Sequence, residues 1–63
     1  MSRDLTLEIA HIRNVLRRSV AAGLCTAEAH QALERMQEIS FAGDPLDYEC
    51  RRWRTQLGLL RQA

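Results

Sequence analysis

The chain has 63 residues, of which 46% are hydrophobic and 27% charged, and its formal net charge is only +1. Such a composition excludes a disordered, highly charged tail, and the length excludes a second domain. We therefore expect one small domain over residues 1–63, whose core is modest enough that apolar burial against a second copy would add useful stability.

No apolar run approaches the roughly 18 residues that a membrane span needs. The N-terminus also lacks the basic and then apolar order of a secretory signal peptide. We expect a cytoplasmic protein with no membrane partner, in which both cysteines, Cys25 and Cys50, stay reduced.

The first predicted element is a helix from about Asp4 to Ala22. Its apolar residues recur at spacings of three and four, which places them on one helix face: Leu5, Ile9, Ile12 and Leu16. Ser2 or Asp4 can serve as the N-cap. Gly23 suits the position after the last turn, where a positive φ is common.

The second predicted helix begins after Thr26, a favourable N-cap, and ends near Phe41 or Ala42. Leu24 and Cys25 form a short connection in front of it. Its apolar side again has helical spacing and comprises Ala29, Ala32, Leu33, Met36 and Ile39.

The run Gly43-Asp44-Pro45 predicts the end of one helix and the start of the next. Gly43 can take the positive φ after a helix, Asp44 can cap the third helix, and Pro45 suits the first helical position, because its missing N–H is not needed there. The third helix should continue to about Arg61. Its apolar residues have the most regular spacing in the chain: Leu46, Cys50, Trp53, Leu57 and Leu60.

These three capped segments predict an all-α fold. Because connections this short favour antiparallel neighbours, we expect three short antiparallel helices arranged as a three-helix bundle. The alternative is a helical hairpin in which two of the segments merge. In either arrangement, dimerisation would complete the core.

The residues that could carry chemistry are few. Cys25, His11 and His30 could form a cysteine–histidine pair, but the chain has no CxxC or HExxH motif, and a structural zinc site usually takes four ligands. Glu34 and Glu38 lie four residues apart, a spacing typical of a solvated helix face. We therefore expect no enzyme activity, no metal and no cofactor.

A small nucleic-acid-binding regulator is the alternative function. Arg51, Arg52 and Arg54 flank Trp53 in the third helix, and the first helix could add a second basic strip from Arg13, Arg17 and Arg18. However, a net charge of +1 is low for a phosphate-binding domain. Acids also precede bases along the first and third helices, as the helix dipole favours, so the arginine positions have a structural explanation.

Binding to another protein has more support. Several apolar residues fall outside the three stripes, and one small bundle cannot cover them all. Tyrosine, tryptophan and arginine are also enriched at protein interfaces. The candidate partner or dimer interface comprises Leu7, Val15, Val20, Tyr48, Arg51, Arg52, Trp53, Arg54 and Leu59. Trp53 also belongs to the predicted core stripe of the third helix.

The size and helical layout resemble those of small phage-encoded host-takeover proteins, such as quorum-sensing anti-activators. The run from Gly43-Asp44-Pro45 through Tyr48 to Gly58-Leu59-Leu60 is also similar to small co-chaperones of type III secretion needle subunits, in which the tyrosine-to-glycine interval is longer. The first resemblance implies a stoichiometric inhibitor or anti-activator of a host regulatory protein, and the second implies a co-chaperone. We expect a homodimer whose main partner is another protein.

Overall fold

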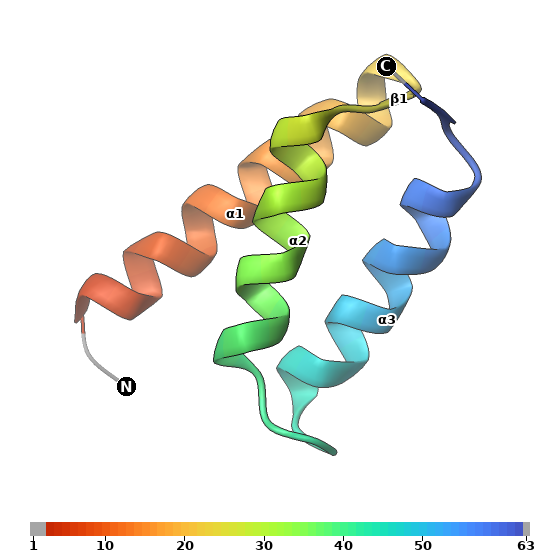
Figure 1. Cartoon of the computed structure of the whole chain (residues 1–63). Helices are drawn as coiled ribbons and strands as arrows, with labels where there is room; N and C mark the ends of the chain where they lie inside the picture. The colour runs from red at the N-terminus through yellow and green to blue at the C-terminus, as the bar shows by residue number, and fades with distance from the viewer. Residues whose placement is uncertain (1–2, 63) are drawn as a thin grey trace.

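The computed structural model describes residues 3–62, which form three helices and one small sheet (Figure 1). The helices are α1 (Arg3–Ala22), α2 (Ala27–Ile39) and α3 (Pro45–Gly58), and the strands are β1 (Leu24–Cys25) and β2 (Arg61–Gln62). In Figure 1 the chain rises along α1, descends along α2 and rises again along α3. Helices of 20, 13 and 14 residues make up most of the described chain, which confirms the predicted all-α class.

The ends of α1 agree closely with the prediction. Asp4 lies inside the first turn of the helix, where its negative charge suits the dipole, and so is not the cap. The other N-cap considered, Ser2, lies outside the described residues. Gly23 adopts a φ of +72° directly after the last helical residue, as predicted, and its N–H donates to the Val20 carbonyl at 3.1 Å.

Both later helices begin at the predicted side-chain caps. The Thr26 hydroxyl accepts a hydrogen bond from the Ala29 N–H at 3.0 Å. The Asp44 carboxylate accepts one from the Asp47 N–H at 2.8 Å, and Pro45 occupies the first helical position of α3. These short-range contacts explain why α2 and α3 start where they do.

The turn between α2 and α3 differs from the prediction. α2 ends at Ile39 because Ser40 is extended, with φ −77° and ψ 150°, and its N–H makes the last helical hydrogen bond. Gly43 has a φ of +86° but lies further along, within the turn, and not directly after the helix. The second carboxylate oxygen of Asp44 accepts from the Phe41 N–H at 3.0 Å, so one side chain both closes this turn and caps α3.

The C-terminal segment is the largest departure from the prediction. α3 ends at Gly58, short of the predicted end near Arg61, and the chain then continues into β2. β2 pairs in parallel with β1, so the predicted connection Leu24–Cys25 is a short strand. The Ser19 hydroxyl of α1 donates to the Leu24 carbonyl, which anchors β1 to the helix. The pairing supplies hydrogen-bond partners to the backbone groups of both strands. If α3 continued as a helix, it could not supply such partners to β1.

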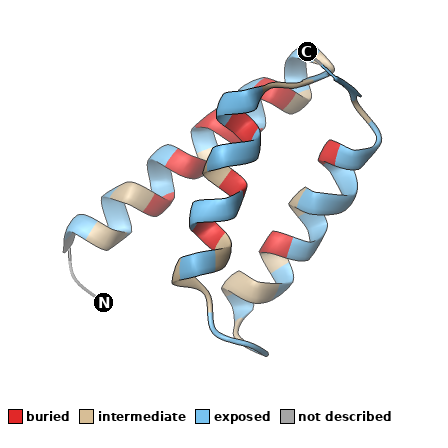
Figure 2. Ribbon diagram, viewed as in Figure 1, coloured by how far each residue is buried: buried red, intermediate tan, exposed pale blue. Residues whose placement is uncertain are grey.

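The core lies between the three helices (Figure 2). Most residues of the predicted stripes are buried or pack against the core, which confirms the helical periodicity. The fully or nearly buried hydrophobic residues are Ile9, Ile12, Val15, Leu16, Ala29, Leu33, Met36, Cys50 and Leu57.

Two residues predicted to lie outside the core are in fact part of it or packed on it. Val15 is only 5% exposed, and Val20 is half-buried and packs against the core. The reason is that α1 contacts both other helices, so its buried arc is wider than one stripe. Trp53 is half-buried and packs against the core from one side, without being fully enclosed by it.

Candidate functional site

The candidate site is a groove between α1 and α3. α1 packs mainly against α2 and only lightly against α3. Two adjoining hollows, of about 490 and 580 Å³, lie along this open side, and Arg13, Pro45 and Glu49 line both of them. We call the two together the α1/α3 groove. Its further lining residues are Arg17, Tyr48, Arg52, Trp53 and Gln56 in the first hollow, and Leu5, Thr6, Ile9, Ile39, Phe41, Asp44 and Leu46 in the second.

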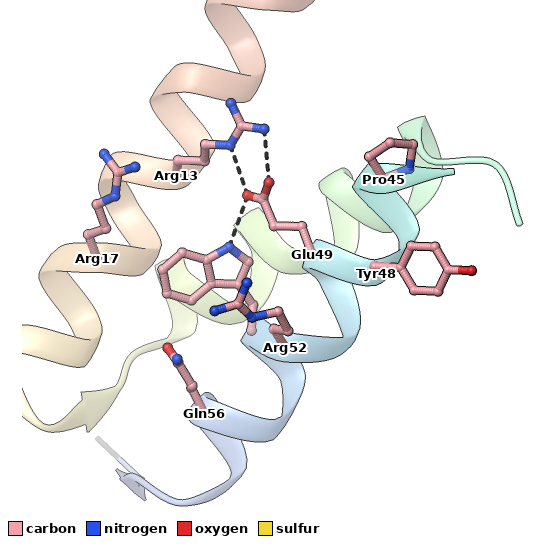
Figure 3. A pocket seen from close by; sticks show the side chains of 8 residues that line it. Arg13, Arg17, Pro45, Tyr48, Glu49, Arg52 and Gln56 are labelled. Carbon is pink, nitrogen blue, oxygen red and sulfur yellow. Dashed lines mark hydrogen bonds and ion pairs between the residues drawn. The ribbon is translucent and has the colours of Figure 1, made fainter. Parts of the chain in front are cut away.

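An ion pair between Arg13 and Glu49 bridges the groove where the two hollows meet (Figure 3). Arg13 donates from Nε to Glu49 Oε2 at 2.8 Å and from Nη2 to Oε1 at 2.9 Å, so the guanidinium holds the carboxylate bidentately. The Trp53 indole N–H donates to the same Glu49 Oε2 at 3.1 Å.

The bridge changes the acidity of both partners. The hydrogen bonds from Arg13 lower the pKa of Glu49, burial of the carboxylate opposes them, and the Trp53 hydrogen bond lowers the pKa further. The same carboxylate raises the pKa of Arg13. Both groups are therefore charged at neutral pH and neutralise each other, so the positive charge that remains available in the groove belongs to other arginines.

The second hollow forms an apolar end of the groove. Its apolar lining comes from all three helices, with Leu5 and Ile9 from α1, Leu46 from α3 and Ile39 from the end of α2. Phe41 stands at its rim with 78% of its surface exposed. A large aromatic side chain this exposed beside an apolar hollow is typical of a binding surface.

The first hollow forms a basic end. Arg17 of α1 and Arg52 of α3 line it together with Trp53 and the exposed ring of Tyr48 (Figure 3). Within residues 3–62, neither of these two guanidinium groups makes a hydrogen bond or an ion pair, although the charge of Arg17 contributes to lowering the pKa of Glu49. The basic end thus presents two uncommitted guanidinium groups beside a half-buried indole.

The sequence pattern suggested that the helix dipole explains the positions of the arginines, but the structure does not support this explanation. No helix of the described chain has a basic residue in its last turn. Arg13 instead pairs with Glu49 of another helix, and Arg35 pairs with Glu8 at 2.6 Å. Arg17 makes no hydrogen bond or ion pair within residues 3–62, and its charge acts on Glu49 only from a distance.

Three of the nine predicted interface residues line the groove: Tyr48, Arg52 and Trp53. Arg51 lies beside it, pairs with Asp47 at 3.4 Å, and stacks over the ring of Tyr48.

The other predicted interface residues lie elsewhere. Arg54 lines a separate hollow between α2 and α3. Leu7 and Leu59 are exposed, by 64% and 82%, and line neither hollow of the groove. Val15 is buried in the core and Val20 is half-buried against it, and neither of them lines the groove.

One row of residues along α1 could have indicated the groove from the sequence, although the apolar stripes alone do not reveal it. Leu5, Ile9, Arg13 and Arg17 are each four residues apart, so they form one row along α1 that changes from apolar to basic. All four line the groove. Glu49, Gln56 and Phe41 are among the lining residues that the sequence analysis did not name as interface candidates.

The residues that the structure describes were also compared with the requirements of a metal site. No group of three or more histidine, cysteine, aspartate or glutamate side chains within residues 3–62 is placed to hold a metal ion. Cys25 and His30 do line one shared hollow, as a cysteine–histidine pair would require, but no hydrogen bond joins them. Among the described helices, none is both long enough and apolar enough to cross a membrane.

Comparison with protein-family models, with curated proteins and with solved structures found no match. The functional argument therefore depends on the α1/α3 groove itself.

Proposed function

We propose that the protein is a small protein-binding module that acts stoichiometrically, as an inhibitor or anti-activator of a host regulatory protein. In this proposal a helical segment of the regulator lies in the α1/α3 groove and is thereby kept from its normal contacts. The observation that carries the proposal is the apolar end of the groove, with Phe41 exposed at its rim. The resemblance in size and layout to phage-encoded anti-activators supports the same reading.

The proposal is tested by a capture experiment, in which matched variants are mixed with an extract of the host and the proteins that each variant retains are compared. Phe41→Ser changes the rim of the groove, whereas Leu59→Ser changes an equally exposed apolar residue outside it. Both side chains are more than three quarters exposed, so both variants should fold. We expect the unmodified protein and the Leu59 variant to retain the same cytoplasmic host protein, and the Phe41 variant to lose it.

The purified partner then allows the stoichiometry and the consequence of binding to be measured. Titration by calorimetry should reach saturation at one regulator per groove, and the regulator's own activity should fall in proportion to occupancy. A host protein retained equally by both variants would overturn the assignment to the groove. A partner that is stabilised but not inhibited would favour the alternative role of a secretion-type co-chaperone.

The second proposal concerns self-association. We propose a homodimer in which a second copy completes the antiparallel helices by covering apolar side chains outside the groove; those exposed there include Leu7, Leu24 and Leu59. Sedimentation equilibrium should give about twice the 7.2 kDa chain mass, and the melting temperature should fall on dilution. A species of single-chain mass whose melting temperature is independent of concentration would refute the dimer.

Nucleic-acid binding by the arginines of α3 remains the alternative function. Its support is weaker, because Arg51 is paired with Asp47 and Arg54 lies at a different hollow from Arg52. Affinity for DNA or RNA that falls steeply with added salt would favour this alternative.

A further inference from the structure

We infer that the segment bound in the α1/α3 groove is an acidic amphipathic helix, with apolar residues at one end and carboxylates about two turns further along. This inference depends on the proposed function and specifies the chemistry of the partner. Its apolar residues would enter the apolar end beside Phe41, and its carboxylates would be held by Arg17 and Arg52 next to Trp53.

The first support is the charge of the basic end. Among residues 3–62, Glu49 is the one acidic residue that lines this hollow, and its carboxylate already accepts two hydrogen bonds from Arg13 and one from Trp53. The charges of Arg17 and Arg52 therefore have no counterpart within the hollow. A planar guanidinium binds a carboxylate through two parallel hydrogen bonds, as Arg13 does here.

The second support is Trp53, which lines the same hollow as the two arginines. The Trp53 indole is half-buried, and its N–H is already used by Glu49, which leaves its ring surface as the remaining contact. An indole surface beside a charge pair lowers the local solvent exposure and so strengthens the ion pairs formed there. Tryptophan and arginine together are the residues that most often dominate the affinity of protein interfaces.

The third support is the order of residues along the groove. Ile9 and Arg17 are eight residues apart in α1, which corresponds to a rise of about 12 Å. A helix lying along α1 would therefore place an apolar residue and a carboxylate about eight residues apart in its own sequence. This spacing keeps both side chains near one face of the bound helix.

A protein helix fits the groove better than a nucleic acid does. The apolar end offers a polyanion no phosphate contact, and Asp44 lines it. The Asp44 carboxylate accepts hydrogen bonds from the backbone N–H groups of Phe41 and Asp47, so it keeps its negative charge, which would repel a continuous phosphate backbone. A short helix with its acids confined to one end avoids this repulsion.

The test uses a synthetic helical peptide of about 16 residues, with leucines one turn apart near one end and two glutamates about eight residues further on. Two comparison peptides carry glutamine or lysine in place of the glutamates, and a short DNA duplex is the fourth ligand. Trp53 is the only tryptophan of the chain and lies in the groove, so its fluorescence reports occupancy directly.

We expect the glutamate peptide to bind at least about tenfold more tightly than the glutamine peptide, and the lysine peptide to bind most weakly. Arg17→Gln and Arg52→Gln should each reduce the affinity for the glutamate peptide by about three- to tenfold and remove most of its advantage over the glutamine peptide. Arg18→Gln and Arg61→Gln are the matched controls, because both arginines are exposed and neither lines the groove. Circular dichroism should show unchanged helix content in all four variants.

The outcomes separate this inference from the proposed function. If the glutamate and glutamine peptides bind equally well and Phe41→Ser abolishes both, the acidic specificity is wrong and the protein-binding groove remains. If no peptide binds, the acidic-helix inference is overturned, and the capture experiment above decides the proposed function separately. If the DNA duplex displaces the glutamate peptide and Arg17→Gln weakens DNA binding more, the ligand is a nucleic acid and the inference fails.

Discussion

Arg13 and Glu49 join α1 to α3 through two hydrogen bonds of 2.8 and 2.9 Å, although 36 residues separate them in the chain. The pair lies where the apolar and basic ends of the groove meet. It therefore has two consequences: it ties together the two helices that pack least closely, and it removes Arg13 from the charges available to a ligand. The Trp53 N–H bond to Glu49 extends the same network.

Replacing Glu49 with glutamine should destabilise the fold. The amide oxygen can still accept from Trp53, but the charged contact with Arg13 is lost, and we expect a loss of about 1 kcal/mol in the free energy of unfolding, because the pair is only partly buried. Urea denaturation monitored by circular dichroism measures it. Glu34→Gln is the control, since Glu34 is exposed and its ion pair is formed with His30 of its own helix. Equal losses in both variants would show that the interhelical bridge contributes nothing specific.

Acid should destabilise the protein, because three carboxyl groups have lowered pKa values in the folded state. Hydrogen bonds from Arg35 lower the pKa of Glu8, those from Arg13 lower the pKa of Glu49, and the Phe41 and Asp47 N–H groups lower the pKa of Asp44.

A lowered folded-state pKa contributes stability above the unfolded value, roughly 4, and that contribution is lost as the pH falls through the folded value. The melting temperature should thus be nearly constant from about pH 6 to 8 and fall steadily below about pH 4.5. Glu49→Gln should reduce the size of this fall. A melting temperature that rises on acidification would contradict the assigned shifts.

Asp44 should contribute more to stability than the other N-cap. Its carboxylate accepts from the Asp47 N–H at 2.8 Å and from the Phe41 N–H at 3.0 Å, whereas the Thr26 hydroxyl accepts one bond. We expect Asp44→Ala to destabilise the fold more than Thr26→Ala, whose cost should be about 1 kcal/mol. Asp44→Asn, which keeps an acceptor oxygen for the helix N–H, should recover part of the loss. Thermal unfolding of the three variants tests this order. A smaller loss of stability for Asp44→Ala than for Thr26→Ala would contradict the prediction.

The two cysteines should differ in reactivity. Cys50 is 1% exposed, and burial raises the pKa of its thiol, so little reactive thiolate forms. Cys25 is half-buried and reaches the surface hollow near His30. In the folded protein, iodoacetamide should therefore modify one thiol quickly, and peptide mass spectrometry should place the label on Cys25. Cys25→Ser should leave only slow modification, and rapid labelling of Cys50 would argue against its burial.

The local features of the fold could be predicted because they depend on residues close in sequence. A helix cap needs a side-chain acceptor and an N–H three residues later, so Thr26 and Asp44 could be identified from the chain alone. The apolar spacing likewise placed Ile9, Ile12 and Leu16 on one buried face.

Tertiary contacts decided the remaining features. Val15 is buried because two helices, and not one, pack around α1, and no spacing within α1 states how many neighbours it has. α3 stops at Gly58 and the residues after it pair with β1, whose partner residues lie 37 positions earlier in the chain (61 − 24 = 37).

The candidate site was predicted only in part, for the same reason. Tyr48, Arg52 and Trp53 could be named from residue type, but the pairing of Arg13 with Glu49 leaves Arg17 and Arg52 as the available cations, and that pairing depends on how α1 and α3 approach each other. The sequence alone determined the periodicity and the helix starts, since these arise within a few residues. The tertiary structure decided which charges are neutralised and which remain free, because an ion pair depends on distance in space.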